Sequence, residues 1–160
     1  MAVELTTQQV WQEIEKKLFA VLGFVTAEGE ARTAGIVYVV DNQKIYIATG
    51  NHSWKSRHIR TNPHVSMTVN LPKRIPLLPW INIPDATITF AGVGAVHDPK
   101  DVDPDVVHAL LHGLETNLEL LATMCVIEVQ PVDDFITYGV GIPLADMRHP
   151  EKARGRAPVS

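Results

Sequence analysis

Between residues 19 and 48 the chain holds three short runs of strand-forming residues, separated only by turn-forming pairs. Aliphatic and aromatic residues dominate each run, and such side chains favour strands. The separating pairs, Glu28-Gly29 and Asp41-Asn42, are typical of tight turns. The sequence therefore predicts a three-stranded meander with short loops. We expect its strands at residues 19–25, 31–40 and 44–48.

Strand and helix patterns continue through the rest of the chain. Further strand patterns occur at residues 64–70, 86–96, 124–132 and 135–140. Helix-start signals occur as a capping-box pair at Thr6 and Gln9, an N-cap at Ser53, and Asp103-Pro104. Short strands with tight turns favour a barrel over a layered parallel sheet. We expect a mainly β protein with a few helices.

Residues 71–85 contain four prolines, which exclude a regular helix or a central strand. This apolar loop, with Trp80 inside it, could cover a ligand, or it could pack on the barrel end or in a subunit interface. Residues 1–140 are expected to form the single domain. The polar and basic residues 141–160 are expected to form a tail that lies over a surface or a partner subunit.

Composition narrows the class of protein. With 46% hydrophobic and 20% charged residues, the chain is typical of a globular domain. A net charge of −4 argues against nucleic-acid coating, which needs a basic excess. The single cysteine, Cys125, fits a reducing compartment, and neither a signal peptide nor a membrane-spanning run is evident. We expect a cytoplasmic protein with no nucleic-acid or membrane partner.

Groups suited to phosphate binding are concentrated in residues 45–66. A strand leads into a short loop, and the loop opens a helix at Ser53. The first turn of a helix has unpaired amide donors and a partial positive charge, so it suits an anion. A well-capped surface helix would show the same pattern. The candidate anion ligands are the hydroxyl groups and cations of Thr49, Ser53, Lys55, Ser56 and Arg57.

The same stretch resembles the signature of the pyridoxamine-phosphate-oxidase-like superfamily of FMN-binding split barrels. In this signature a strand, Thr, a short loop, Ser-x-Lys, a helix and Asn-Pro-x-Val-Ser follow in order. Leu22-Gly-x-Val upstream and Gly92-x-Gly-Ala-x-x-x-Asp downstream are similar to the family, so the resemblance spans residues 15–132. It implies a split β-barrel of six to seven antiparallel strands in Greek-key-like order. It also implies FMN as the cofactor and a homodimer that shares two cofactors.

Position by position, the resemblance implies which residues contact the cofactor. Ser53 and Lys55 match phosphate ligands, and the strand end before them lines the ribityl chain. The backbone of residues 35–38 would face the isoalloxazine ring, and Thr87 would reach the cofactor from the other subunit. Trp54 stands where the family often has a basic residue, so we expect its ring to pack on a neighbour instead of pairing with an anion. The full candidate set is Gly35, Ile36, Val37, Tyr38, Ala48, Thr49, His52, Ser53, Trp54, Lys55, Arg57 and Thr87.

The sequence also departs from the family pattern. Ala34 stands where the family often has a phosphate-binding arginine, and Arg57 is the candidate to take that role. The Ser-Arg-Pro-x-x-Ser-Gln motif of true pyridoxamine-phosphate oxidases is missing, so oxidation of pyridoxamine phosphate is not expected. His108 and His112 have a metal-binding spacing but are expected to face solvent, and no metal site is assigned.

These features predict an FMN-dependent oxidoreductase that acts on a small-molecule redox substrate. Flavin chemistry asks the protein for binding, orientation and electrostatics, so no catalytic side chain is assigned. Three alternatives stay open: a deazaflavin-dependent reductase, a non-catalytic flavin- or haem-binding protein, and a barrel that binds nothing.

Overall fold

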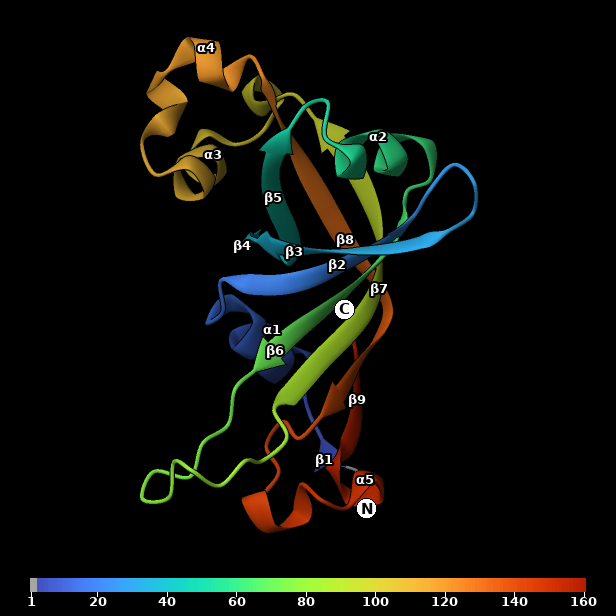
Figure 1. Cartoon of the computed structure of the whole chain (residues 1–160), viewed down its shortest axis with the longest axis vertical. Helices are drawn as coiled ribbons and strands as arrows, with labels where there is room; N and C mark the ends of the chain where they lie inside the picture. Colours follow the sequence, from blue (N-terminus) through green and yellow to red (C-terminus); the bar gives the residue numbers. More distant parts are fainter. Residues whose placement is uncertain (1–2) are drawn as a thin grey trace.

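The computed structural model describes residues 3–160 as one curled sheet with short helices at its edges (Figure 1). Its strands are β1 (Val3–Glu4), β2 (Phe19–Val25), β3 (Ala31–Val37), β4 (Val39–Asp41), β5 (Lys44–Gly50), β6 (His64–Leu71), β7 (Ala86–His97), β8 (Met124–Tyr138) and β9 (Arg154–Pro158). Its α-helices are α1 (Thr7–Glu15), α2 (Trp54–Thr61), α3 (Pro104–Leu111), α4 (Leu118–Leu121) and α5 (Pro150–Ala153). Single 3₁₀ turns are η1 (Pro99–Asp101), η2 (Leu114–Thr116) and η3 (Leu144–Asp146). No helix within residues 3–160 has the length and apolar character needed to cross a membrane.

The strands of the described residues close into a barrel. Their order is β1-β9-β8-β7-β6-β2-β3, and β5 pairs with β8 on one side and with β4 on the other. Only Tyr38 separates β3 from β4, so this continuous segment joins the two edges of the sheet. All pairings are antiparallel except that of β1 with β9. The split-barrel fold expected from the sequence is confirmed.

Helix α1 packs against the barrel core. The capping box predicted at Thr6 and Gln9 is present. Trp11 is buried and meets Phe135 edge-on, with ring centroids 5.3 Å apart. The hydroxyl of Tyr38 donates to the carbonyl of Ile14 at 2.7 Å. Helix α1 is therefore fixed to the barrel at the point where β3 passes into β4.

Strand β8 differs from the sequence expectation. Two strands were expected, at residues 124–132 and 135–140, but residues Met124–Tyr138 form one strand. Its first part pairs with β5 up to Val129, and its last part pairs with β9 from Asp134 onward. Pro131, which has no N–H to donate, lies between these two partners, so no bond is lost on that side. A positive φ of 62° at Asp133 marks the bend that had looked like a turn.

The C-terminal residues also differ from the expected tail. Arg154–Pro158 form β9, which pairs with β8 and with β1 of the same chain. Buried Gly155 and Ala157 alternate with exposed arginines, a period-two pattern that the basic composition concealed. Residues 154–158 thus extend the barrel sheet. Contact between this segment and a partner subunit stays a prediction.

Helix α2 packs closely on β7 at a glycine. A Cβ built at Gly94 would lie 2.9 Å from Cγ2 of Ile59 in α2. The amide of Gly94 also donates to the carbonyl of Pro63 at 2.7 Å. This close approach at a glycine fixes the position of α2 beside the barrel wall.

Candidate functional site

An apolar cavity of about 530 Å³ lies against the barrel wall, with walls from β3, β4, β5, α2 and α3. Two of its side chains can carry a positive charge, Lys55 from α2 and His112 at the end of α3. The other lining residues are Leu18, Gly35, Ile36, Val37, Tyr38, Val39, Ile47, Ala48, Ala109 and Leu110. A cavity of this kind suits a ligand with an apolar body and an anionic group.

One wall is the segment that joins β3 to β4. Ile36 is 5% exposed and Tyr38 is 1% exposed, because both side chains point into the barrel. Their side chains are therefore almost fully covered, whereas Val37 on the outer face is 62% exposed. Residues 35–38 all line the cavity, and contact of their backbone with a cofactor ring stays a prediction. Tyr38 offers no side chain to a ligand, because its hydroxyl is bonded to Ile14.

The hydroxyl groups around the start of α2 are bonded to one another. Thr49 Oγ1 donates to Ser53 Oγ at 3.3 Å, and Ser53 Oγ donates to Ser56 Oγ at 3.1 Å. Ser56 in turn donates to the carbonyls of Gly50, Asn51 and Ser53. Ser53 also accepts the amide of Ser56, which confirms it as the N-cap of α2. The hydroxyl protons of Thr49 and Ser53 are therefore used within the chain, and neither residue lines the cavity.

Lys55 is the predicted phosphate ligand that the structure brings to the cavity. It lies half-buried in the first turn of α2, next to Ala48 at the end of β5. No carboxylate within residues 3–160 lies within ion-pair distance of its ammonium group. The amides of Trp54 and Lys55 have no acceptor within the described chain, as expected of a first helical turn. This end of the cavity is electropositive.

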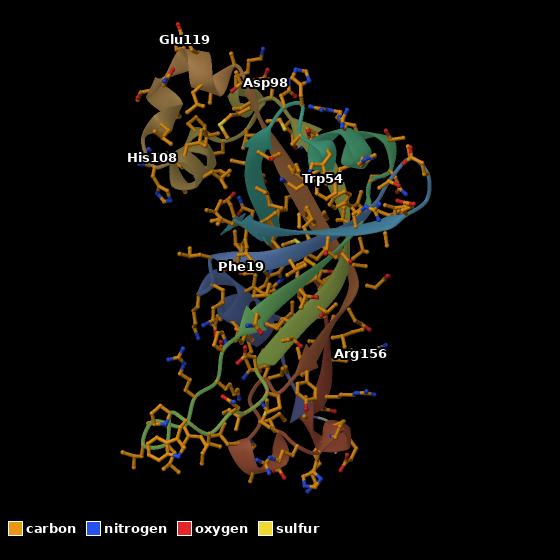
Figure 2. The ribbon with its side chains drawn as sticks, viewed as in Figure 1. Phe19, Trp54, Asp98, His108, Glu119 and Arg156 are labelled. Carbon is orange, nitrogen blue, oxygen red and sulfur yellow. The ribbon has the colours of Figure 1, made fainter. Side chains whose placement is uncertain are left out.

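Four other candidate residues lie outside the cavity wall. His52 and Arg57 are exposed on the loop and on α2. The ring of Trp54, which is labelled in Figure 2, packs on Phe24 with ring centroids 5.0 Å apart. This agrees with the expectation that Trp54 packs on a neighbour, although the family often has a basic residue at this position. Thr87 pairs with Tyr138 near the start of β7. Contact of these residues with a ligand, including contact of Thr87 in the other subunit, stays a prediction.

The contribution of α3 was not foreseen. His108 and His112 are both exposed, as expected, but His112 also lines the cavity, whereas His108 pairs with Glu115. Helix α3 ends at His112 in a left-handed conformation with φ of 50° and ψ of 43°. Leu114 lies beyond this helix end, in η2, and is 58% exposed. Gly113, directly after His112, was the signal in the sequence for this early helix end.

Burial keeps three titratable groups near the barrel neutral. It raises the pKa of the Tyr38 phenol far above its ordinary value, and it raises the pKa of the Cys125 thiol. Burial, together with the charge of Glu128, raises the pKa of Tyr46 to about 12. Cys125, which is 1% exposed, thus remains a protonated thiol at neutral pH.

Comparison with known proteins defines the class to which this barrel and its cavity belong. The family model described as pyridoxamine 5'-phosphate oxidase matches residues 6–117, more than two thirds of the chain. The chain is a member of this family. No curated protein matches it.

Solved structures share the fold at low sequence identity. The conserved hypothetical protein Rv2991 from Mycobacterium tuberculosis superposes with a TM-score of 0.64 and 13% identity, over 85% of this chain and 88% of the other. An F420 reductase superposes with a TM-score of 0.52 and 19% identity, over 76% of this chain and 91% of the other. HutZ, the haem storage protein from Vibrio cholerae, superposes with a TM-score of 0.58 and 13% identity, over 84% of this chain and 96% of the other. Proteins with this fold are therefore described with deazaflavin and with haem, and the fold alone does not select the ligand.

Proposed function

We propose that this protein binds FMN in the cavity between α2 and α3 and acts as an oxidoreductase on a small molecule. The observation that carries the proposal is the position of Lys55 at the edge of an apolar cavity, where its ammonium group has no carboxylate partner among residues 3–160. Membership of the pyridoxamine 5'-phosphate oxidase family supports it.

The residues present fit a flavin mononucleotide. Lys55 and the free amides at the start of α2 would hold the phosphate, because a cation and a helix N-terminus both favour negative charge. The exposed backbone of residues 35–38 would face the ring. FMN, when bound, supplies hydride and electron transfer at its ring. The chain contributes binding, orientation and an apolar wall that excludes water.

A homodimer is part of the proposal. A row of small and apolar residues crosses the outer face of the sheet from β3 to β8. The member of this row in β8 is Ile136, which is 50% exposed. Phe19 and Val37 are 53% and 62% exposed beside this row. Exposed apolar side chains on one sheet face support a two-fold interface between copies. The row runs through Gly35, Val21, Thr68, Thr89, Ile136 and Arg156.

The first prediction tests the phosphate contact. Lys55→Met should weaken FMN binding about tenfold to a hundredfold, since a hydrogen bond to a charged group contributes about 1.5–3 kcal/mol. Riboflavin, which lacks the phosphate, should bind wild type and variant equally. Fluorescence titration with both ligands measures the difference.

A matched control is Lys100→Met, because Lys100 is exposed outside the cavity and pairs with Asp98. It should leave both affinities unchanged. Equal FMN affinity of wild type and Lys55→Met would show that Lys55 does not bind the phosphate. A wild-type protein that binds no FMN would refute the proposed function.

The fold relatives indicate which other ligands to test. The absorption spectrum of the purified protein separates an oxidised flavin from a deazaflavin and from haem. Turnover with a reduced nicotinamide and an electron acceptor would then separate an enzyme from a binding protein. A cytoplasmic location, expected from the single cysteine, belongs to the same proposal.

A further inference from the structure

The loop of residues 72–85 projects from one end of the molecule and exposes apolar side chains (Figure 1). Leu77 is 87% exposed and Trp80 is 72% exposed. The base of the loop is held in place, because Asp85 accepts hydrogen bonds from the Asn70 side chain at 2.9 Å and the Lys73 amide at 3.2 Å. Its prolines restrict the backbone further. An apolar surface presented in this way is typical of an interaction site.

This loop also has a small positive excess. It contains Lys73 and Arg74, and its one acidic residue, Asp85, lies at its base and is hydrogen-bonded there. Lys73 Nζ donates to the carbonyl of Ile142, whereas Arg74 is exposed and has no ion-pair partner within residues 3–160. The loop therefore combines an apolar tip with a positive flank.

The opposite end of the molecule carries the complementary surface. We call residues 101–121 the cap; they include α3, η2 and α4, and they contain no Lys or Arg. Leu114 is 58% exposed and Leu118 is 75% exposed, with Glu119 at the outer end of the cap (Figure 2). The same cap supplies the α3 wall of the cavity. Its acidic residues are Asp101, Asp103, Asp105, Glu115 and Glu119.

We propose that the 72–85 loop of one copy docks on the cap of a second copy, and the reverse. The loop and the cap of one chain lie at opposite ends of its longest axis, so they do not meet within that chain (Figure 1). A two-fold axis perpendicular to the longest axis exchanges the ends and forms the contact twice. Leu77 and Trp80 then cover the exposed leucines of the cap, and Arg74 faces its carboxylates.

The inference rests on the homodimer of the proposed function and adds a role for the loop. Docking on the cap encloses the α3 side of the cavity, where Leu110 and His112 lie. Each cavity is then completed by a segment of the other chain. The loop becomes part of the ligand site without touching the cavity of its own chain.

Cross-linking between two different variants tests the contact. Leu77→Cys and Leu118→Cys chains, carrying tags of different mass, are mixed and treated with a short bis-maleimide. The native Cys125 is buried and does not interfere. A covalent dimer that joins the two variants is expected, and neither variant alone should give it. Leu144→Cys, an exposed position outside the loop and the cap, is the matched control when mixed with Leu118→Cys.

A charge exchange tests the same contact without a reagent. Arg74→Glu and Glu119→Arg should each raise the dimer dissociation constant a few-fold, and the double variant should return toward the wild-type value. Leu77→Ser with Trp80→Ser should raise it by at least about tenfold. Sedimentation velocity measures all of these variants.

The outcomes separate the two proposals. A wild-type dimer that shows no Leu77–Leu118 cross-link above the control overturns the docking and leaves the FMN proposal standing. A wild-type monomer overturns both the docking and the homodimer. A dimer that binds no FMN but gives the cross-link overturns the proposed function alone.

Discussion

Ser53 and Lys55 are two positions apart, and the structure gives them different roles. Ser53 caps α2 and relays a hydrogen bond from Thr49 to Ser56, whereas Lys55 lines the cavity. The sequence had placed both in one set of phosphate ligands, because residue type and spacing are similar for a cap and for a ligand. Only the tertiary contacts show which hydroxyl protons are already in use.

At Tyr38 the backbone and the side chain serve separate purposes. Tyr38→Phe removes the hydrogen bond from the Tyr38 hydroxyl to the Ile14 carbonyl. Because this carbonyl still accepts a hydrogen bond from the Lys17 amide, we expect the free energy of unfolding to fall by only about 1 kcal/mol. Ligand affinity should not change, because the Tyr38 side chain is only 1% exposed and its hydroxyl points to Ile14. Urea denaturation and flavin titration measure the two effects. A fall in affinity at unchanged stability would contradict this assignment.

Helix α2 was well predicted, whereas α3 was predicted correctly at its start, Asp103-Pro104, but not at its end. The helix start at Ser53 and the capping box of α1 are local signals, and both are confirmed. The cavity wall from α3 depends on how the segment after β7 folds back on β4 and β5, which no local pattern reports. Strand β8 was divided in two because Pro131 and Asp133-Asp134 look like a turn when the neighbouring strands are unknown.

The start of α2 can be tested as a unit by separating its cap from its charge. Ser53→Asp keeps a good N-cap, so stability should change by less than about 0.5 kcal/mol. The added negative charge should weaken FMN binding at least about tenfold and leave riboflavin binding unchanged. Thermal melts and paired titrations measure this.

Ser53→Ala provides the comparison. Loss of the cap should lower the free energy of unfolding by about 1 kcal/mol, while the ratio of FMN to riboflavin affinity stays at its wild-type value. If Ser53→Asp binds FMN as wild type does, the start of α2 does not hold the phosphate.

For the whole molecule, the fold class followed from short strands and tight turns, whereas the outer surfaces did not. The outer sheet face, the 72–85 loop and the cap each expose apolar side chains that a single barrel does not cover. The sequence showed that these residues are apolar, but it did not show whether each would face the core or the solvent. That difference is set by the closure of the barrel.

Assembly through the sheet face has a direct test. Ile136→Lys places a charge on the row that crosses β2, β3, β6, β7 and β8, so the dimer should dissociate while the melting temperature of the fold stays within a few degrees. Leu144→Lys, at an exposed position outside that row, should remain dimeric. Sedimentation equilibrium measures the mass, and a dimeric Ile136→Lys protein would exclude this face.

Strand β8 is the shared neighbour of β5, β7 and β9, and it lies in the last quarter of the chain. During synthesis on the ribosome, β5 has no partner on its β8 side until about eighty further residues have been added. Barrel closure is therefore a late event that depends on contacts distant in sequence, which makes folding slow for a chain of this size. Throughout that interval the nascent chain exposes an unpaired strand edge.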